Sequence, residues 1–110
     1  MMIIEKKPKR LGGINIAQLD VGSRIDIQTL NNLYIIKLLG GNRIMIQGGH
    51  LNKPVAGMFV GSCGRASLIK QNWIGKGMRM EITYDGKKLL TSKARGARVV
   101  GDVWLYELWD

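Results

Sequence analysis

A basic segment late in the chain is the strongest candidate for a functional site in the sequence. Residues 87–98 hold five basic residues and no acidic one, with small residues between them. Arginine can grip a phosphate through two parallel hydrogen bonds, and a backbone with small side chains can approach a phosphate closely. The segment therefore predicts a binding surface for an anion, made by Lys87, Lys88, Lys93, Arg95 and Arg98. The alternative is a solvated basic strand and loop without a ligand.

The charge of the whole chain favours the same kind of partner. The sequence has 17 Lys and Arg against 8 Asp and Glu, a formal net charge of +9. A surplus of this size attracts polyanions, and nucleic acid binds basic surfaces through its phosphates with little sequence preference. RNA or DNA is therefore the first partner to expect, although the same charge could serve solubility alone.

Trp73 is the aromatic residue best placed to add base stacking to such a surface. It lies between Lys70 and Lys76 in the sequence. An aromatic ring among cations is typical of surfaces that bind unpaired bases. The alternative is a core role, because large aromatic side chains dominate core burial.

Catalytic and metal chemistry have little support. His50 and Cys63 are the only residues of their types, and a nucleophilic Cys–His pair would require the fold to bring them together. Structural zinc needs about four Cys or His ligands, more than the chain contains. The acidic residues form no clustered pair for acid–base chemistry, and no helix is expected after the Gly-Gly pairs, as a phosphate loop requires. We therefore predict no catalytic residue, metal or cofactor, and keep an enzyme or small-ligand barrel of unfamiliar chemistry as an alternative.

The lone Cys63 excludes an internal disulfide and suits a reducing compartment. The apolar run at residues 1–4 is too short for a signal-peptide core or a membrane span. We expect a cytoplasmic protein without a membrane partner. Residues 1–10 are expected to form a basic arm, and residues 11–110 a single β domain.

Strands are the elements that must position these residues. Gly makes up 15 of 110 residues, as expected for many tight turns. Asn31-Asn32 predicts a two-residue hairpin turn that sets Ile25 opposite Leu38, Ile27 opposite Ile36, and Asp26 opposite Lys37. A three-residue loop at 40–42 then sets Leu38 opposite Ile44 and Ile36 opposite Ile46, which extends the hairpin into a three-stranded meander.

The second half of the chain predicts another hairpin, turning at Asp85-Gly86, with Ile82 opposite Leu89 and Met80 opposite Thr91. Two less regular strands are expected at 55–60 and 66–72, joined by a turn at 61–64. A further strand is expected from residue 99 to beyond 103. Residues 104–109 suit either a strand or a short amphipathic helix.

About seven short strands predict an all-β fold, a small antiparallel barrel or sandwich comparable in size to SH3-like or Sm-like barrels. Leu33 and Ile35 fall on the outer face of the first hairpin, and a homodimer through that face is expected unless another segment covers it. The predicted function is a non-catalytic binding module for an anionic partner, most simply nucleic acid. A protein-interaction or self-assembling barrel is the alternative.

Overall fold

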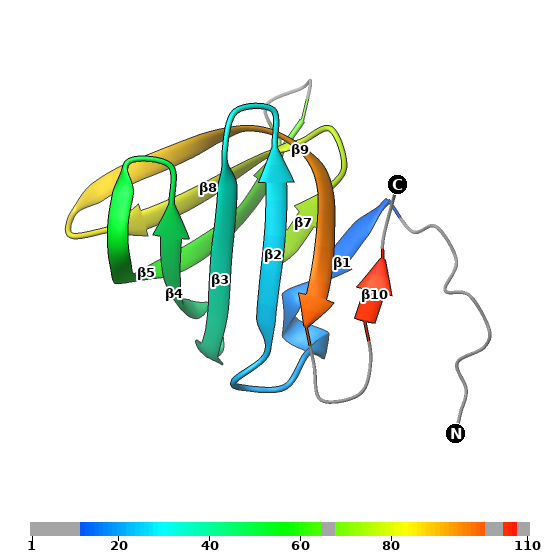
Figure 1. Cartoon of the computed structure of the whole chain (residues 1–110), viewed down its shortest axis with the longest axis horizontal. Coiled ribbons are helices and arrows are strands. Elements are labelled where there is room, and N and C mark those ends of the chain that lie inside the picture. Colours follow the sequence, from blue (N-terminus) through cyan, green and yellow to red (C-terminus); the bar gives the residue numbers. More distant parts are fainter. Residues whose placement is uncertain (1–11, 65–67, 101–104, 108–110) are drawn as a thin grey trace.

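The computed structural model describes residues 12–64, 68–100 and 105–107, the last three as backbone only, and consists almost entirely of strands (Figure 1). A single 3₁₀ turn, η1 (Ile16–Gln18), lies in these residues. The ten strands are β1 (Gly13–Asn15), β2 (Arg24–Thr29), β3 (Leu33–Gly40), β4 (Arg43–Gly48), β5 (Leu51–Cys63), β6 (Ile69–Gln71), β7 (Trp73–Gly75), β8 (Arg79–Tyr84), β9 (Lys87–Val100) and β10 (Leu105–Glu107). The predicted arm at residues 1–10 lies outside the described residues.

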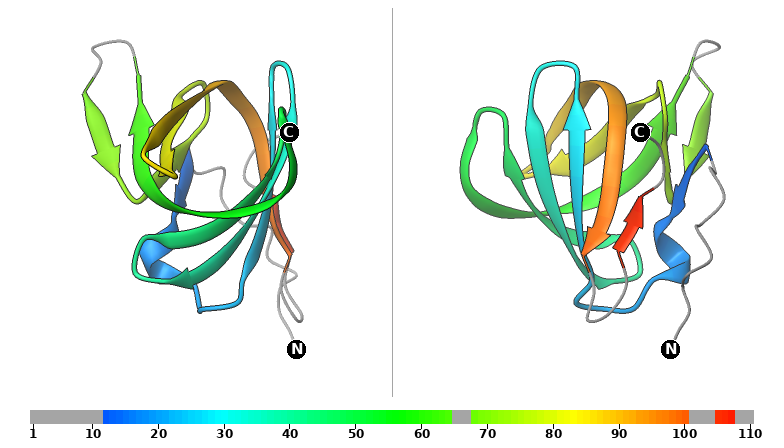
Figure 2. Two further views of the ribbon diagram at one scale, coloured as in Figure 1. Left: turned by 90° about the vertical axis from the view of Figure 1, so that its left-hand side faces the viewer. Right: turned by 45° about the vertical axis from the view of Figure 1, so that its right-hand side comes forward.

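Six of the strands close into an antiparallel barrel. The pairs β2–β3, β3–β4, β4–β5, β5–β8, β8–β9 and β9–β2 form a complete circuit. Closure is possible because β5 and β9 are long, with 13 and 14 residues, and curve around the barrel (Figure 2). Each of them pairs with two other barrel strands and also with one short strand, β6 or β10. The predicted all-β barrel is confirmed. The strand number exceeds the expected seven because β1, β6, β7 and β10 have only three residues each.

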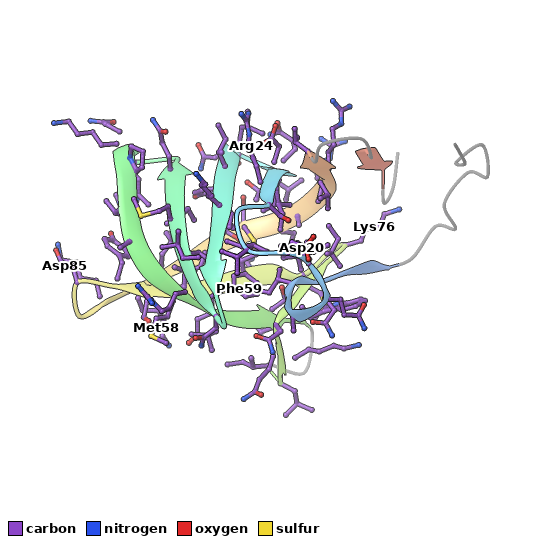
Figure 3. The ribbon with its side chains drawn as sticks, turned by 90° about the horizontal axis from the view of Figure 1, so that it is seen from below. Asp20, Arg24, Met58, Phe59, Lys76 and Asp85 are labelled. Carbon is purple, nitrogen blue, oxygen red and sulfur yellow. The ribbon has the colours of Figure 1, made fainter. Side chains whose placement is uncertain are left out.

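The barrel interior is filled by the alternate residues that the sequence pattern placed there. The meander pairs Ile36 with Ile46 and Leu38 with Ile44, as predicted, and all four side chains are buried. The outer face is open to solvent. Figure 3 labels a neighbouring pair on β5 that shows the difference: Phe59 is 1% exposed and Met58 is 45% exposed.

The predicted register of the first hairpin is wrong by two residues. Ile25 lies opposite Ile36, and Asp26 lies opposite Ile35 rather than Lys37. The cause is the buried Thr29, whose hydroxyl accepts the Asn32 N–H and donates to the Asn32 carbonyl, both at 3.0 Å. These bonds close the turn one residue earlier than Asn31-Asn32 would. A shift of two residues keeps every side chain on its face, so the predicted core survived the error.

Two other predicted features differ in the structure. Residues 61–63 are not a turn but the end of β5, where Cys63 pairs with Ile69 of β6 on one side and Arg79 of β8 on the other. Among the described residues of the expected strand at 66–72, residues 69–71 form β6, and residues 66 and 67 lie outside the described part.

The second hairpin turns where predicted. Asp85 and Gly86 have φ of 53° and 73°, and Ile82 lies opposite Leu89. A bulge follows, so that Met80 meets Thr91 through a bond from its N–H to the Thr91 hydroxyl at 3.0 Å.

The strand expected from residue 99 begins within β9, which is described as far as Val100; residues 101–104 lie outside the described part. Leu105–Glu107 form β10, paired antiparallel to β9, so a helix is excluded there, while residues 104, 108 and 109 lie outside the described part.

One end of the barrel is covered by the small β1–β7 sheet and η1. Ile14, Ile16 and Ile74 from these elements are buried and belong to the main core. In the described part of the chain, no helix reaches the length and apolarity that crossing a membrane requires.

Candidate nucleic-acid interface

All five basic residues singled out in the sequence lie on β9, and all are exposed (Lys87, Lys88, Lys93, Arg95 and Arg98). The exposure of Lys88, Lys93, Arg95 and Arg98 follows from the strand's alternation and its bulges, whereas Lys87 is exposed at the start of the strand, beside the hairpin turn. Residues between them, such as Leu89, Thr91, Ala94, Ala97 and Val99, are buried in the barrel. The structure therefore places four of the five predicted residues along one outward-facing line.

Two bulges keep that line continuous. Between the pairs Glu81–Leu90 and Arg79–Lys93, β9 advances three residues while β8 advances two. Between Thr29–Ala94 and Gln28–Gly96, β9 again carries one extra residue, Arg95. Because side chains alternate with period two, an odd spacing on one face requires such a bulge. The bulges lie where β9 leaves β8 and joins β2.

β9 bends where it passes from β8 to β2, and two basic residues from other segments lie beside it at this bend. Arg79 of β8 lies directly opposite Lys93. Lys76 lies in a tight turn closed by the Met78 N–H on the Gly75 carbonyl at 3.1 Å, with Gly77 at φ 76°. The Gly77 N–H donates to the Ala94 carbonyl at 2.8 Å, which fixes the turn against β9. The Lys76 side chain points away from the barrel (Figure 3).

We call Lys76, Arg79, Lys93 and Arg95 the basic corner. All four are exposed. The sequence alone does not place Lys76 and Arg79 beside β9. The alternation of β8 indicates that Arg79 points outward. No sequence signal indicates the bulge that sets Arg79 opposite Lys93.

The two ends of β9 differ from the corner because acidic residues lie near them. Lys88 pairs with Glu81 at 3.7 Å. Arg98 lies between two acidic register positions, Asp26 on β2 and Glu107 on β10. The acid nearest the corner along β8 is Glu81, and its described ion pair is with Lys88. The excess positive charge is therefore greatest at the bend.

Asp26 is itself engaged by Arg24. The Arg24 Nε and one terminal nitrogen donate to the two carboxylate oxygens at 2.8 and 3.2 Å. This hydrogen bond, and then the attraction between the charges, raises the pKa of Arg24 above its ordinary value. The described ion pair of Asp26 is therefore with Arg24, and Arg98 is its neighbour in the strand register.

Trp73 lies on β7 opposite Asn15 of β1, three residues before Lys76 of the basic corner. Its ring packs against two glycines: a Cβ added at Gly13 or at Gly75 would lie 2.7 Å from ring atoms. The Lys70 ammonium lies 4.1 Å from the ring centroid. A base could stack there only by displacing Lys70, so the structure gives this ring a cation–π partner already.

The fold does not bring His50 and Cys63 together, because they lie at opposite ends of β5. The His50 Nε2 lies 3.0 Å from the Tyr84 hydroxyl, and Cys63 is half-buried. Among the residues that the structure describes, no three His, Cys, Asp or Glu residues are grouped in a way that could hold a metal ion.

The two predicted interface residues lie on the outer face of β3. Leu33 is 50% exposed. Ile35 is half-buried and lines an open groove of about 480 Å³ with Lys37, Met45 and Pro54. The groove is mainly apolar, with cations at its rim.

Comparison of the chain with protein-family models, with curated proteins and with solved structures gives no match.

Proposed function

We propose that this protein is a non-catalytic module that binds nucleic acid through the basic corner. The observation that carries the proposal is the register pair Arg79–Lys93. Residues directly opposite on antiparallel strands have Cβ atoms about 4.5–5.5 Å apart, and like charges there destabilise a sheet. A polyanion bound across the pair would attract both side chains and so offset the repulsion between them.

The chemistry of the corner suits phosphates. Arg79 and Arg95 offer forked donors for two phosphate oxygens each, and Lys76 and Lys93 add point charges. Trp73, the predicted stacking residue, lies on a different sheet. Contacts of this kind are made to the phosphates of the nucleic acid and not to its bases, so binding to RNA or DNA should show weak sequence specificity. A cytoplasmic location, which the lone Cys63 favours, would give access to both RNA and DNA.

The position of the site is tested with labelled single-stranded and double-stranded oligonucleotides and fluorescence anisotropy at one low salt concentration. Lys93→Gln/Arg95→Gln removes two charges from the corner. Lys37→Gln/Lys53→Gln removes two exposed charges from β3 and β5 and serves as the matched control. The corner variant should bind at least tenfold more weakly than the control. Equal losses in the two variants would show that only net charge matters and that the corner is not the site.

A second candidate function is self-association through the outer face of the first hairpin. Leu30 and Leu33 are 57% and 50% exposed, and the groove beside Ile35 continues the apolar surface. The proposed partner is a second copy of the chain, which would bury these side chains. Light scattering should then give a dimer mass for the wild type and a monomer mass for Leu33→Glu. A monomer mass for the wild type at tens of micromolar would exclude this function.

A further inference from the structure

A second pocket lies at the end of the barrel that carries η1. It has a volume of about 420 Å³ and lies between η1, the β3–β4 turn and the segment that joins β6 to β7. That size is at the lower end of the range for small-molecule sites, roughly 300–1,000 Å³. It shares no residue with the basic corner.

The pocket has no charged lining residue, although the chain has 17 basic ones. One part of the wall is apolar and comes from Ile16, Leu19, Val21, Leu38 and Val60. Val21 is 70% exposed, so an apolar side chain stands at the mouth of the pocket. A wall of this kind favours a flat apolar body over a charged one, because an ion would lose its hydration without gaining a partner.

Three of the lining residues carry amide side chains: Asn42, Gln71 and Asn72. Two of them stand on fixed backbone: the Asn42 carbonyl accepts the Phe59 N–H and the Asn72 carbonyl accepts the Ile16 N–H, both at 2.8 Å. Within the part of the chain that the structure describes, none of the three amide groups has a hydrogen-bond partner in the protein.

Asn72 also has φ of 59°, in the left-handed region. A residue other than glycine is held there at a cost in free energy, although Asn tolerates the region better than most. Asn72 therefore lines the pocket from a constrained backbone position.

An amide group presents a donor and an acceptor side by side, which matches the edge of a heterocyclic base. We propose that this pocket binds one uncharged heterocycle of the nucleobase or nucleoside class, with its flat face on the apolar wall and its polar edge on the amides. The pocket and the basic corner are separate surfaces, so this site does not depend on the proposed nucleic-acid binding.

The test is an NMR titration of the full chain with adenosine, which has no charge to bring it to the basic corner. The backbone amide signals of Gly40, Gly41, Asn42 and Asn72 should shift together and saturate. The signals of Lys93 and Arg95 should stay in place. Absence of saturable shifts at the pocket would overturn the proposal, and so would shifts confined to the corner.

Asn72→Gly is the sharpest variant, because glycine adopts the positive φ without strain while the amide side chain is removed. It should raise the Kd for adenosine about tenfold, in line with the loss of a hydrogen-bonded pair of atoms. Gln71→Ala, at an exposed position, gives an independent check in case Asn72→Gly fails to fold. Asn52→Ala, an exposed residue of β5 outside the pocket, is the matched control and should leave the Kd unchanged. Equal Kd values for wild type, Asn72→Gly and Gln71→Ala would contradict the assignment.

Discussion

Arg79 and Lys93 lie directly opposite each other on the outer face of the barrel, one on β8 and the other on β9. Further along the same two strands, Lys88 and Glu81 form an ion pair at 3.7 Å. The same ribbon thus carries one attractive and one repulsive contact. A contact that lowers stability is commonly explained by function, and here an anionic partner would supply the missing charge.

The first prediction concerns this pair. Arg79→Glu places an acid opposite Lys93 and should raise the free energy of unfolding by roughly 0.5–1 kcal/mol, the usual scale of cross-strand charge pairs. The melting temperature in low salt should rise by a few degrees. The same variant should lose affinity for nucleic acid. Calorimetry and anisotropy measure the two effects.

Arg43→Glu is the control for that experiment, because Arg43 is exposed and lies opposite Met58, an uncharged residue. Like Arg79→Glu, it replaces a positive charge by a negative one, but it creates no cross-strand ion pair. If both variants shift the melting temperature equally, the register pair has no special role.

The second prediction separates two arginines that the sequence treats alike. Arg95 is the extra residue of a bulge at the basic corner, whereas Arg98 lies between the register positions of Asp26 and Glu107. Arg95→Gln should therefore weaken nucleic-acid binding severalfold more than Arg98→Gln, measured by anisotropy in the same buffer. The reverse order would place the binding surface towards β10.

Much of the barrel could be predicted from the sequence, because burial has a simple period in strands. The inward residues of the meander follow from alternation, and the Asp85-Gly86 turn follows from its residues. The register of the first hairpin did not follow. The register depends on the buried Thr29 hydroxyl, which bonds to the backbone of Asn32. A shift of two residues leaves the alternation of buried and exposed side chains unchanged, so the alternation does not reveal it.

The candidate site was predictable only in part, for a similar reason. The five basic residues of β9 were evident in the sequence, and the exposure of those beyond Lys87 follows from the period and the bulges. The different surroundings of these five residues were not evident in the sequence. The neighbours of Arg98 and the partner of Lys93 depend on two bulges and on strand pairings between distant segments, none of which has a local sequence signal.

The third prediction tests the sheet that covers the barrel end. A Cβ at Gly13 would lie 2.2 Å from the Ile74 carbonyl oxygen, a backbone atom that cannot move aside. Gly13→Ala should therefore lower the free energy of unfolding by about 1–3 kcal/mol, as overpacking does. Urea denaturation followed by circular dichroism measures it. Gly12→Ala is the matched control, since nothing lies within 4 Å of its Cβ, and should change stability little. Similar midpoints for the two variants would contradict this packing.

The most direct test of the central claim is the salt dependence of nucleic-acid binding. For duplex DNA, each phosphate contact contributes about 0.9 to the slope of log K against log salt. The wild type should show a steep slope, and Lys93→Gln/Arg95→Gln a slope about 1.8 smaller, with the Lys37→Gln/Lys53→Gln control close to wild type. Equal slopes for all three proteins, or no binding at low salt, would contradict the central claim.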